Sequence, residues 1–322
     1  MRTKLCDLLG IESPVIQAGM GSFTSAELVA AVSKAGGLGS LGASTRSAGD
    51  LRKELRRVRE LTDRPFAINH TVRFLDKEAF ALTLEAKPAL ISLAIDNPGA
   101  LVKAAHDAGI RVMYQVPTVQ RAQQAVSLGV DIIVAQGAEA GGFGGVVSTL
   151  ALVPQIVDIA GSIPVVAAGG IADGRGLAAA LMLGAQGINI GTRFLASAEC
   201  PISPEWKQRI LAAQSEDTLK FDAWNDIFHV PEGGYPVTPR VLPSPFVNQW
   251  VNNRDGARRE AERLQERIGT SVQQGTWGDL LPFTGQTAGL IREVLPAGEI
   301  VRRITAEAES ALRQAAALLT GT

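Results

Sequence analysis

The strongest constraint on the fold is a repeated alternation of short apolar segments with segments of helical periodicity. The apolar runs fall at residues 14–19, 38–42, 66–70, 89–94, 112–116, 131–135, 163–168 and 187–191. Most of these runs are continuously apolar, which is typical of strands buried on both faces of a parallel sheet. A helix-like segment separates each run from the next, so the pattern predicts right-handed βαβ units.

Eight such units favour an α/β fold that closes into a (β/α)8 TIM barrel. A doubly wound open sheet is the alternative, but its GxGxxG fingerprint does not follow the first strand. Gly37, Gly39 and Gly42 match that spacing, yet they lie within the second predicted strand. A barrel of about 250 residues leaves room for additions in a chain of 322 residues.

The chain changes character after residue 197, where prolines become frequent and all four tryptophans occur. Residues 204–214 and 246–268 have helical patterns, and the second segment is charged enough to be largely solvated. We therefore predict a barrel over residues 1–197, completed by a closing helix within about 284–322. Residues 198–283 are expected to form a helical region that covers the substrate.

Composition argues against several classes of partner. The net charge is −1 with both signs interspersed, which does not favour nucleic acid, and no apolar run approaches the ~20 residues of a membrane span. Cys6 and Cys200 are the only cysteines, so we expect no metal cluster and a reducing, cytoplasmic location. A small molecule is the expected ligand.

A glycine-dense loop, Gln136–Gly145, follows the sixth strand and contains five glycines. Glycine admits positive φ and lets a ligand approach the backbone closely, and loops held by rigid elements often carry function. This loop is therefore predicted to cradle a ligand. Glu139 within it is expected either to face the ligand or to accept hydrogen bonds from backbone amides.

Two further loops point to a phosphate group. Ala168, Gly169 and Gly170 end the seventh strand, and Gly191 and Thr192 end the eighth. TIM barrels commonly bind phosphate at these two loops, through backbone N–H groups and a helix N-terminus. No Walker lysine motif is present, so a nucleoside triphosphate is not expected.

Several segments, in order over nearly the whole chain, resemble the nitronate monooxygenase family, formerly called 2-nitropropane dioxygenases. They are residues 16–20, 35–39, 66–69, 136–145, 167–175, 191–195 and 285–291. The resemblance implies a barrel that binds FMN beneath a helical substrate-covering domain. The same superfamily includes an FMN-dependent enoyl-acyl-carrier-protein reductase and relatives acting on coenzyme A thioesters.

The resemblance also implies the roles of individual residues. It places Ala18, Gly19 and Met20 beneath the flavin ring, and Asn69 and Gln136 near the polar edge of the ring. It places Gly141 and Gly142 along the ligand. The residues that it places around the phosphate are Gly169, Gly170, Gly191 and Thr192.

One position departs from the family. The family pattern has a histidine, its proton acceptor, where this chain has Phe143. A phenyl ring cannot accept a proton, so this position cannot deprotonate a nitroalkane. Among the three histidines, His70 is the best replacement, although strand alternation turns it away if Asn69 faces the flavin. His229 could reach the site from the appended region, and His106 is expected to be solvated.

These observations predict an FMN-dependent oxidoreductase that oxidises a small anionic nitronate or a related carbon acid with O2. Such a substrate arrives already ionised, so no protein base is required. One alternative is an NAD(P)H-linked reductase or dehydrogenase of unsaturated acyl thioesters. Another is a flavin-binding protein without catalytic activity.

Overall fold

The computed structural model describes residues 1–320, and residues 321–322 of the predicted closing segment lie outside the described part. Eight parallel strands form one sheet in the order β1-β9-β8-β6-β5-β4-β3-β2. They are β1 (Val15–Gln17), β2 (Gly39–Gly42), β3 (Phe66–Thr71), β4 (Leu90–Ala94), β5 (Arg111–Val116), β6 (Ile132–Gln136), β8 (Val165–Ala168) and β9 (Gly187–Ile190).

The two edges of this sheet meet beside Leu38. The Gln17 N–H donates to the Leu38 carbonyl at 2.9 Å, and the Leu38 N–H donates to the Val15 carbonyl at 2.9 Å. Ile16 and Leu38 thereby form a parallel bridge between β1 and the approach to β2. This bridge closes the ring, and the predicted TIM barrel is confirmed.

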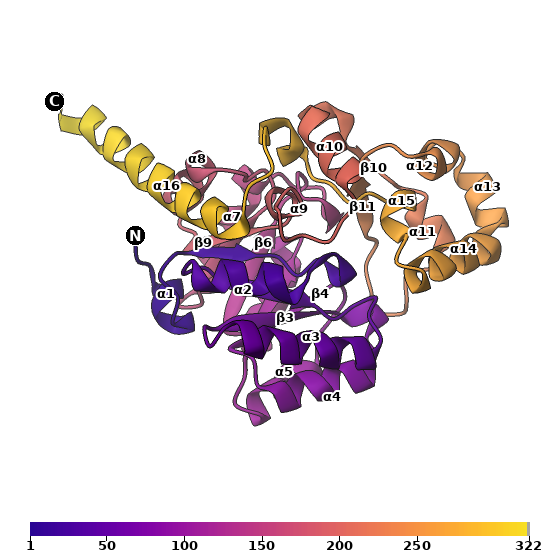
Figure 1. Cartoon of the computed structure of the whole chain (residues 1–322), viewed down its shortest axis with the longest axis horizontal. Helices are drawn as coiled ribbons and strands as arrows, with labels where there is room; N and C mark the ends of the chain where they lie inside the picture. The colour runs from indigo at the N-terminus through magenta and orange to yellow at the C-terminus, as the bar shows by residue number, and fades with distance from the viewer. Residues whose placement is uncertain (321–322) are drawn as a thin grey trace.

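Helices surround the barrel (Figure 1). Those that follow the strands are α2 (Ala26–Lys34), α3 (Ala48–Leu61), α4 (Lys77–Ala86), α5 (Ala100–Asp107), α6 (Val119–Ser127), α7 (Thr149–Ala160) and α8 (Gly174–Met182). The last strand is followed only by the single turn α9 (Thr192–Leu195), and the long helix α16 (Ala297–Thr320) packs against α8 and α2 instead. A helix from the end of the chain thus completes the ring.

A helix not predicted from the sequence, α1 (Lys4–Leu9), closes the N-terminal end of the barrel. Its side chains Leu5, Cys6 and Leu9 are buried in one apolar cluster with interior residues such as Met113 and Ile132. Burying these apolar side chains stabilises this end of the barrel. The opposite end, where the strands finish, is left for a ligand.

Local sequence accounts for most helix boundaries. The side chains of Ser47, Thr118 and Asp173 accept hydrogen bonds from backbone N–H groups in the first turns of α3, α6 and α8, as N-caps do. Helix α7 contains Pro154 and continues through it without interruption, from Thr149 to Ala160.

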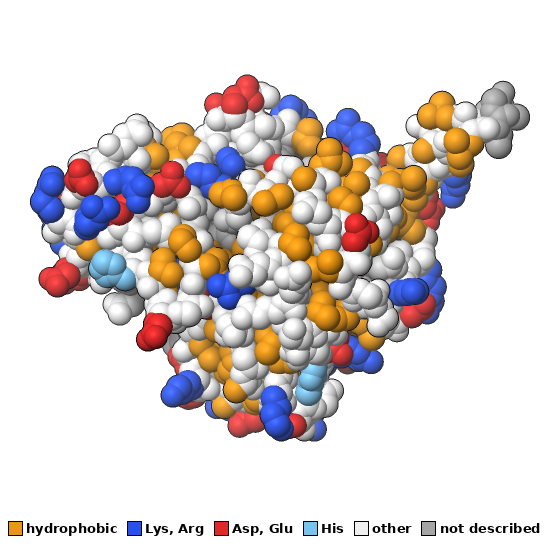
Figure 2. All heavy atoms as spheres, turned by 180° about the vertical axis from the view of Figure 1, so that it is seen from behind, with side chains coloured by type: hydrophobic (Ala, Val, Ile, Leu, Met, Phe, Trp, Pro, Cys, Tyr) orange, Lys and Arg blue, Asp and Glu red, His pale blue; other side chains and the backbone are white. Residues whose placement is uncertain are grey.

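A second layer covers the C-terminal end of the barrel (Figure 1). It contains α10 (Pro204–Ala212), α11 (Trp224–Ile227), α12 (Pro245–Trp250), α13 (Arg254–Arg259), α14 (Ala261–Gln273) and α15 (Trp277–Leu280). The single helix predicted over 246–268 is therefore wrong, because the chain turns twice within it. Figure 2 shows charged side chains gathered on the outer surface of this layer, as its composition predicted.

A small antiparallel sheet joins this layer to the glycine loop. Its strands are β10 (Leu219–Lys220), β11 (Thr238–Val241) and β7 (Gly142–Gly144), in the order β10-β11-β7. Phe143 in β7 lies opposite Pro239 in β11. Part of the predicted glycine loop is therefore a strand. Among the described helices, none is both long and apolar enough to cross a membrane.

Candidate active site

A cavity of about 460 Å³ lies between the C-terminal end of the barrel and the covering layer, within the usual range of small-molecule sites. All the residues predicted to bind the cofactor line this one cavity. They are Ala18, Gly19, Met20, Asn69, Gln136, Gly141, Gly142, Ala168, Gly169, Gly170, Gly191 and Thr192. The fold thus brings together loops that are far apart in the sequence.

Polar side chains from five strands form what we call the floor of the cavity: Asn69, Ser92, Gln115, Gln136 and Asn189. The Asn69 amide donates to the Ser92 hydroxyl at 3.1 Å, and the Asn189 amide lies 3.5 Å from the Gln115 oxygen. The floor therefore contains two hydrogen-bonded pairs of side chains, Asn69 with Ser92 and Asn189 with Gln115.

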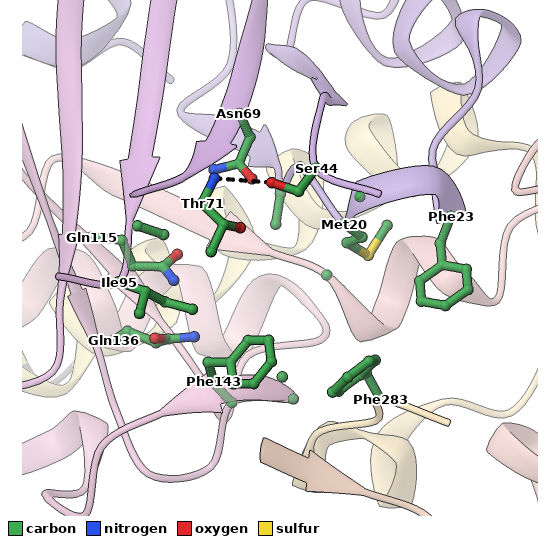
Figure 3. Close-up of a pocket in the computed structure, with 18 of the residues that line it drawn as sticks. Met20, Phe23, Ser44, Asn69, Thr71, Ile95, Gln115, Gln136, Phe143 and Phe283 are labelled. Carbon is green, nitrogen blue, oxygen red and sulfur yellow. Dashed lines mark hydrogen bonds between the residues drawn. The ribbon is translucent and has the colours of Figure 1, made fainter. Parts of the chain in front are cut away.

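Gln136 differs from the rest of the floor. It is only 7% exposed, and its side chain has no hydrogen-bond partner within the described chain. Figure 3 shows its amide extending into the cavity, beside Ile95 and above Phe143. The amide is therefore free to form hydrogen bonds with a polar ligand atom in the cavity.

Glycine is required where the loops approach one another at the edge of the cavity. A Cβ on Gly141 would lie 2.6 Å from the backbone nitrogen of Gly285. Gly169 has a φ of +99°, a conformation that other residues rarely adopt. The Gly285 N–H also donates to the Thr192 hydroxyl at 2.9 Å. Backbone, not side chains, therefore forms this edge.

Glu139 stabilises the loop and does not face the cavity. Its carboxylate accepts hydrogen bonds from the Thr149 N–H at 3.0 and 3.1 Å, at the first turn of α7. The Thr149 hydroxyl lies 2.9 Å from both Glu139 Oε2 and the Gly169 carbonyl oxygen. Of the two roles considered for Glu139, bonding to a backbone amide is the one observed.

Aromatic side chains form what we call the roof of the cavity: Phe74, Phe143, Trp224, Phe228, Trp277 and Phe283. The Phe143 ring lies 5.0 Å from Trp224 and 5.5 Å from Phe283, measured between ring centroids. In Figure 3, Phe143 and Phe283 lie across the cavity from Asn69. The cavity therefore has one polar wall and one aromatic wall.

Among the described residues, no side chain that lines the cavity is ionisable near neutral pH: the lining has no Asp, Glu, His, Cys, Tyr, Lys or Arg. Lys220 lies nearby, where burial lowers its pKa to about 8. Its ammonium group donates to the Gly145 carbonyl at 2.9 Å, so it supports the loop from behind. The cavity holds hydroxyl and amide groups but no side-chain base.

His70, the candidate replacement base, lies outside the cavity between β3 and α4. Its Nε2 is 2.8 Å from the Thr83 hydroxyl, and its ring packs 5.3 Å from Phe80. Burial lowers the pKa of His70 to about 4. Asn69 faces inward, so the next residue faces outward, as strand alternation requires. The structure therefore does not support a catalytic role for His70.

The other two histidines are also outside the lining. His106 contacts Asp131 at 2.9 Å on the outer side of the barrel, and His229 is exposed. Phe143, by contrast, lies in the cavity wall. None of the three histidines, all of which the structure describes, therefore lines the cavity.

Sequence reasoning missed Ser92, Gln115 and Asn189 in the floor. Each lies in a strand that is otherwise largely apolar, and a polar residue in such a strand could have marked an inward-facing position at the barrel mouth. The roof residues gave a weaker signal, because they come from short helices and loops without a sustained period.

Comparison with known proteins places this geometry in a family. The nitronate monooxygenase family profile matches residues 2–81 and 70–307. The chain is 32% identical to a nitronate monooxygenase of Paraburkholderia phytofirmans over 96% of both chains. It is 31% identical to a (3aS,4S,5R,7aS)-5-hydroxy-7a-methyl-1-oxo-octahydro-1H-indene-4-carboxyl-CoA dehydrogenase of Mycobacterium tuberculosis, over 99% of both chains.

Among solved structures, FabK from Thermotoga maritima superposes with a TM-score of 0.89 at 33% identity, covering 99% of each chain. These relatives share the whole length of the chain, including the covering layer. With a family profile that spans most of its residues, the chain belongs to the nitronate monooxygenase family of oxidoreductases.

Proposed function

We propose that this protein is an FMN-dependent oxidoreductase that acts on substrates needing no proton abstraction by a side chain. A nitronate, or a related carbon acid that is already ionised, would be oxidised with O2. The observation that carries this proposal is the cavity lining: Phe143 lies in it, and among the described residues that line the cavity no side chain is ionisable near neutral pH.

The residues fit an FMN molecule. The Gln136 side chain faces the cavity without a hydrogen-bond partner in the described chain, and Asn189 Oδ1 is buried without a hydrogen bond, so the floor offers polar groups to a flavin edge. Gly169, Gly170, Gly191 and Thr192 lie together at the ends of β8 and β9, where a phosphate would meet backbone N–H groups. Met20 and Gly19 would support the ring.

The protein's own contribution is binding, orientation and exclusion of water. The floor amides would fix the polar edge of the cofactor, and the roof would hold the substrate against its other side. FMN, when bound, supplies the electron chemistry. Residues 198–283 would serve as the substrate-covering region, because they contribute Trp224, Phe228, Trp277 and Phe283 to the roof.

Flavin binding has a direct test. The purified protein should be yellow, with the visible absorbance of FMN, and should retain about one FMN per chain after gel filtration. A colourless protein that does not take up added FMN would contradict the proposal.

A second candidate is an NAD(P)H-linked reductase or dehydrogenase of unsaturated acyl thioesters. The aromatic roof favours it, because the roof offers an apolar surface and no cation to pair with a small anion. The similarity to a carboxyl-CoA dehydrogenase over 99% of both chains points the same way.

Anaerobic mixing separates the candidates. Rapid bleaching of the flavin by NADH or NADPH supports the reductase, and bleaching only by an alkyl nitronate supports nitronate oxidation. Stoichiometric FMN that no donor bleaches would identify a flavin-binding protein without catalytic activity.

A further inference from the structure

The six roof rings form one continuous aromatic surface. Successive ring centroids lie 4.8, 5.5, 5.0, 4.3 and 6.2 Å apart, in the order Trp277, Phe283, Phe143, Trp224, Phe228 and Phe74. Each spacing is within the range of direct aromatic contact. No polar side chain interrupts this sequence of contacts, so a ligand can follow it without losing apolar contact.

The two ends of this aromatic surface differ in exposure. Trp277 and Phe283 are 8% and 9% exposed, and Phe74 at the other end is 46% exposed. The surface therefore runs from the interior of the site to the outside of the molecule. An exposed phenylalanine is ordinary by itself, but this one continues the wall of a buried cavity.

The polar and the apolar side chains of the cavity lie on different walls. The floor amides and the glycine loops suit a cofactor with a polar edge and a phosphate. The roof carries no charge, and its two indole N–H groups, of Trp224 and Trp277, are buried. The small anionic substrate expected from the sequence would leave most of this apolar surface without a partner.

We infer that the substrate carries an elongated, uncharged apolar group that lies along this surface, from Phe283 inside to Phe74 at the rim. The inference rests on the proposed function, since it assigns the reacting end of the substrate to the space beside the flavin. Phe228 and Phe74 are then specificity-determining residues, which contact the far end of the substrate and not the reacting atoms.

Binding of straight-chain methyl ketones, from butan-2-one to decan-2-one, tests this inference. The FMN-loaded full chain is titrated with each ketone, and the change in the visible flavin spectrum gives Kd. Kd should fall about fourfold for each added methylene, the fold-change that corresponds to about 0.8 kcal/mol per buried CH2. An affinity that does not depend on chain length would overturn the inference.

Variants locate the binding surface. Phe74→Ser, at an exposed position with little risk to folding, should weaken decan-2-one binding at least about threefold and leave butan-2-one unchanged, because only the longer chain reaches the rim. Phe228→Ser should show the same selectivity. The control Met182→Ser, on α8 and 73% exposed outside the cavity, should leave the whole series unchanged. Equal effects of all three variants would contradict the assignment.

The same titration distinguishes a failure of the proposed function. If the protein takes up no FMN, the flavin proposal fails, and tryptophan fluorescence of the FMN-free chain then reports ketone binding through Trp224 and Trp277. Chain-length dependence in that measurement supports the aromatic surface independently, and its absence overturns it.

Discussion

The floor and the roof of the cavity are built in different ways. The floor comes from regular strands whose register fixes each side chain, and it presents amide and hydroxyl groups. The roof comes from short helices, loops and the β7 strand, and it presents aromatic rings. The contrast teaches that the barrel fixes the polar groups of the cavity, whereas most of its aromatic surface comes from the more irregular layer.

The largest effect is expected from a substitution that gives the roof a proton acceptor. Phe143→His should raise the oxidation of neutral nitroalkanes by about 10²–10⁴-fold over the wild type, the usual contribution of a general base. The rate should increase with pH through the histidine pKa, near 6.5 when unperturbed, because only the neutral ring accepts a proton. Oxygen consumption with nitroethane across pH measures it.

Phe143→Leu is the matched control, since it opens space without adding a base and should not gain this activity. If Phe143→His retains FMN and gains nothing, the lack of a base is not what separates this protein from nitroalkane oxidation.

A second test removes a buried ion pair at the boundary between the barrel and the covering layer. The Arg73 guanidinium pairs with Asp96 at 2.7 and 2.8 Å and donates to the Tyr235 carbonyl at 2.6 Å. Both side chains are nearly buried, so Arg73→Met should cost about 3–5 kcal/mol of unfolding free energy by leaving Asp96 unpaired. Urea denaturation measures the loss.

The surface variant Arg303→Met, which removes exposed pairs with Glu293 and Glu299, should cost much less. A similar loss in both variants would show that the Arg73 pair does not hold the two layers together.

A third test concerns His70, whose side chain lies on the outer face of β3. Burial holds the pKa of His70 at about 4, whereas the unfolded chain takes up this proton below about pH 6.5. Stability is therefore present above pH 6.5 and is lost as the pH falls towards 4, by up to about 3 kcal/mol. Urea denaturation of wild type and His70→Gln at several pH values should show a weaker pH dependence in the variant.

At neutral pH, His70→Gln should keep its FMN and its turnover. A selective loss of turnover in that variant would instead indicate a catalytic role for His70.

The smallest effect is expected from a substitution where the glycine loop contacts Gly285. Gly141→Ala places a methyl group 2.6 Å from the Gly285 nitrogen, and overpacking of this kind costs about 1–3 kcal/mol. Both thermal stability and FMN affinity should fall. Gly49→Ala in α3, whose nearest neighbour is 3.8 Å away, should cause no loss, and equal behaviour of the two variants would contradict the close approach.

The sequence predicted the barrel well because each strand and helix carries its own periodicity. Asn69 and Gln136 could be predicted from the family resemblance, and both lie in the strands that the apolar pattern predicted, Asn69 within β3 and Gln136 at the end of β6. The outward position of His70 follows from strand alternation.

The covering layer was harder to predict for a physical reason. Trp224 and Trp277 lie in single-turn helices, which have too few residues to show a period, and they pack against rings from distant segments. The helix predicted over residues 246–268 failed because local charge patterning could not reveal the turns between α12, α13 and α14. The pairing of β7 with β11 joins residues that are almost a hundred positions apart, which no local pattern encodes.

That pairing also limits how the site can exchange its ligand. β7 carries Phe143 and pairs with β11, which pairs in turn with β10 in the covering layer. If the covering layer moved away from the barrel, these backbone hydrogen bonds would break, or the glycine loop would move with the layer. Motion of Phe74 and its neighbours at the rim requires no such rupture. A ligand therefore enters and leaves the cavity more easily past Phe74 at the rim than by displacement of the whole covering layer.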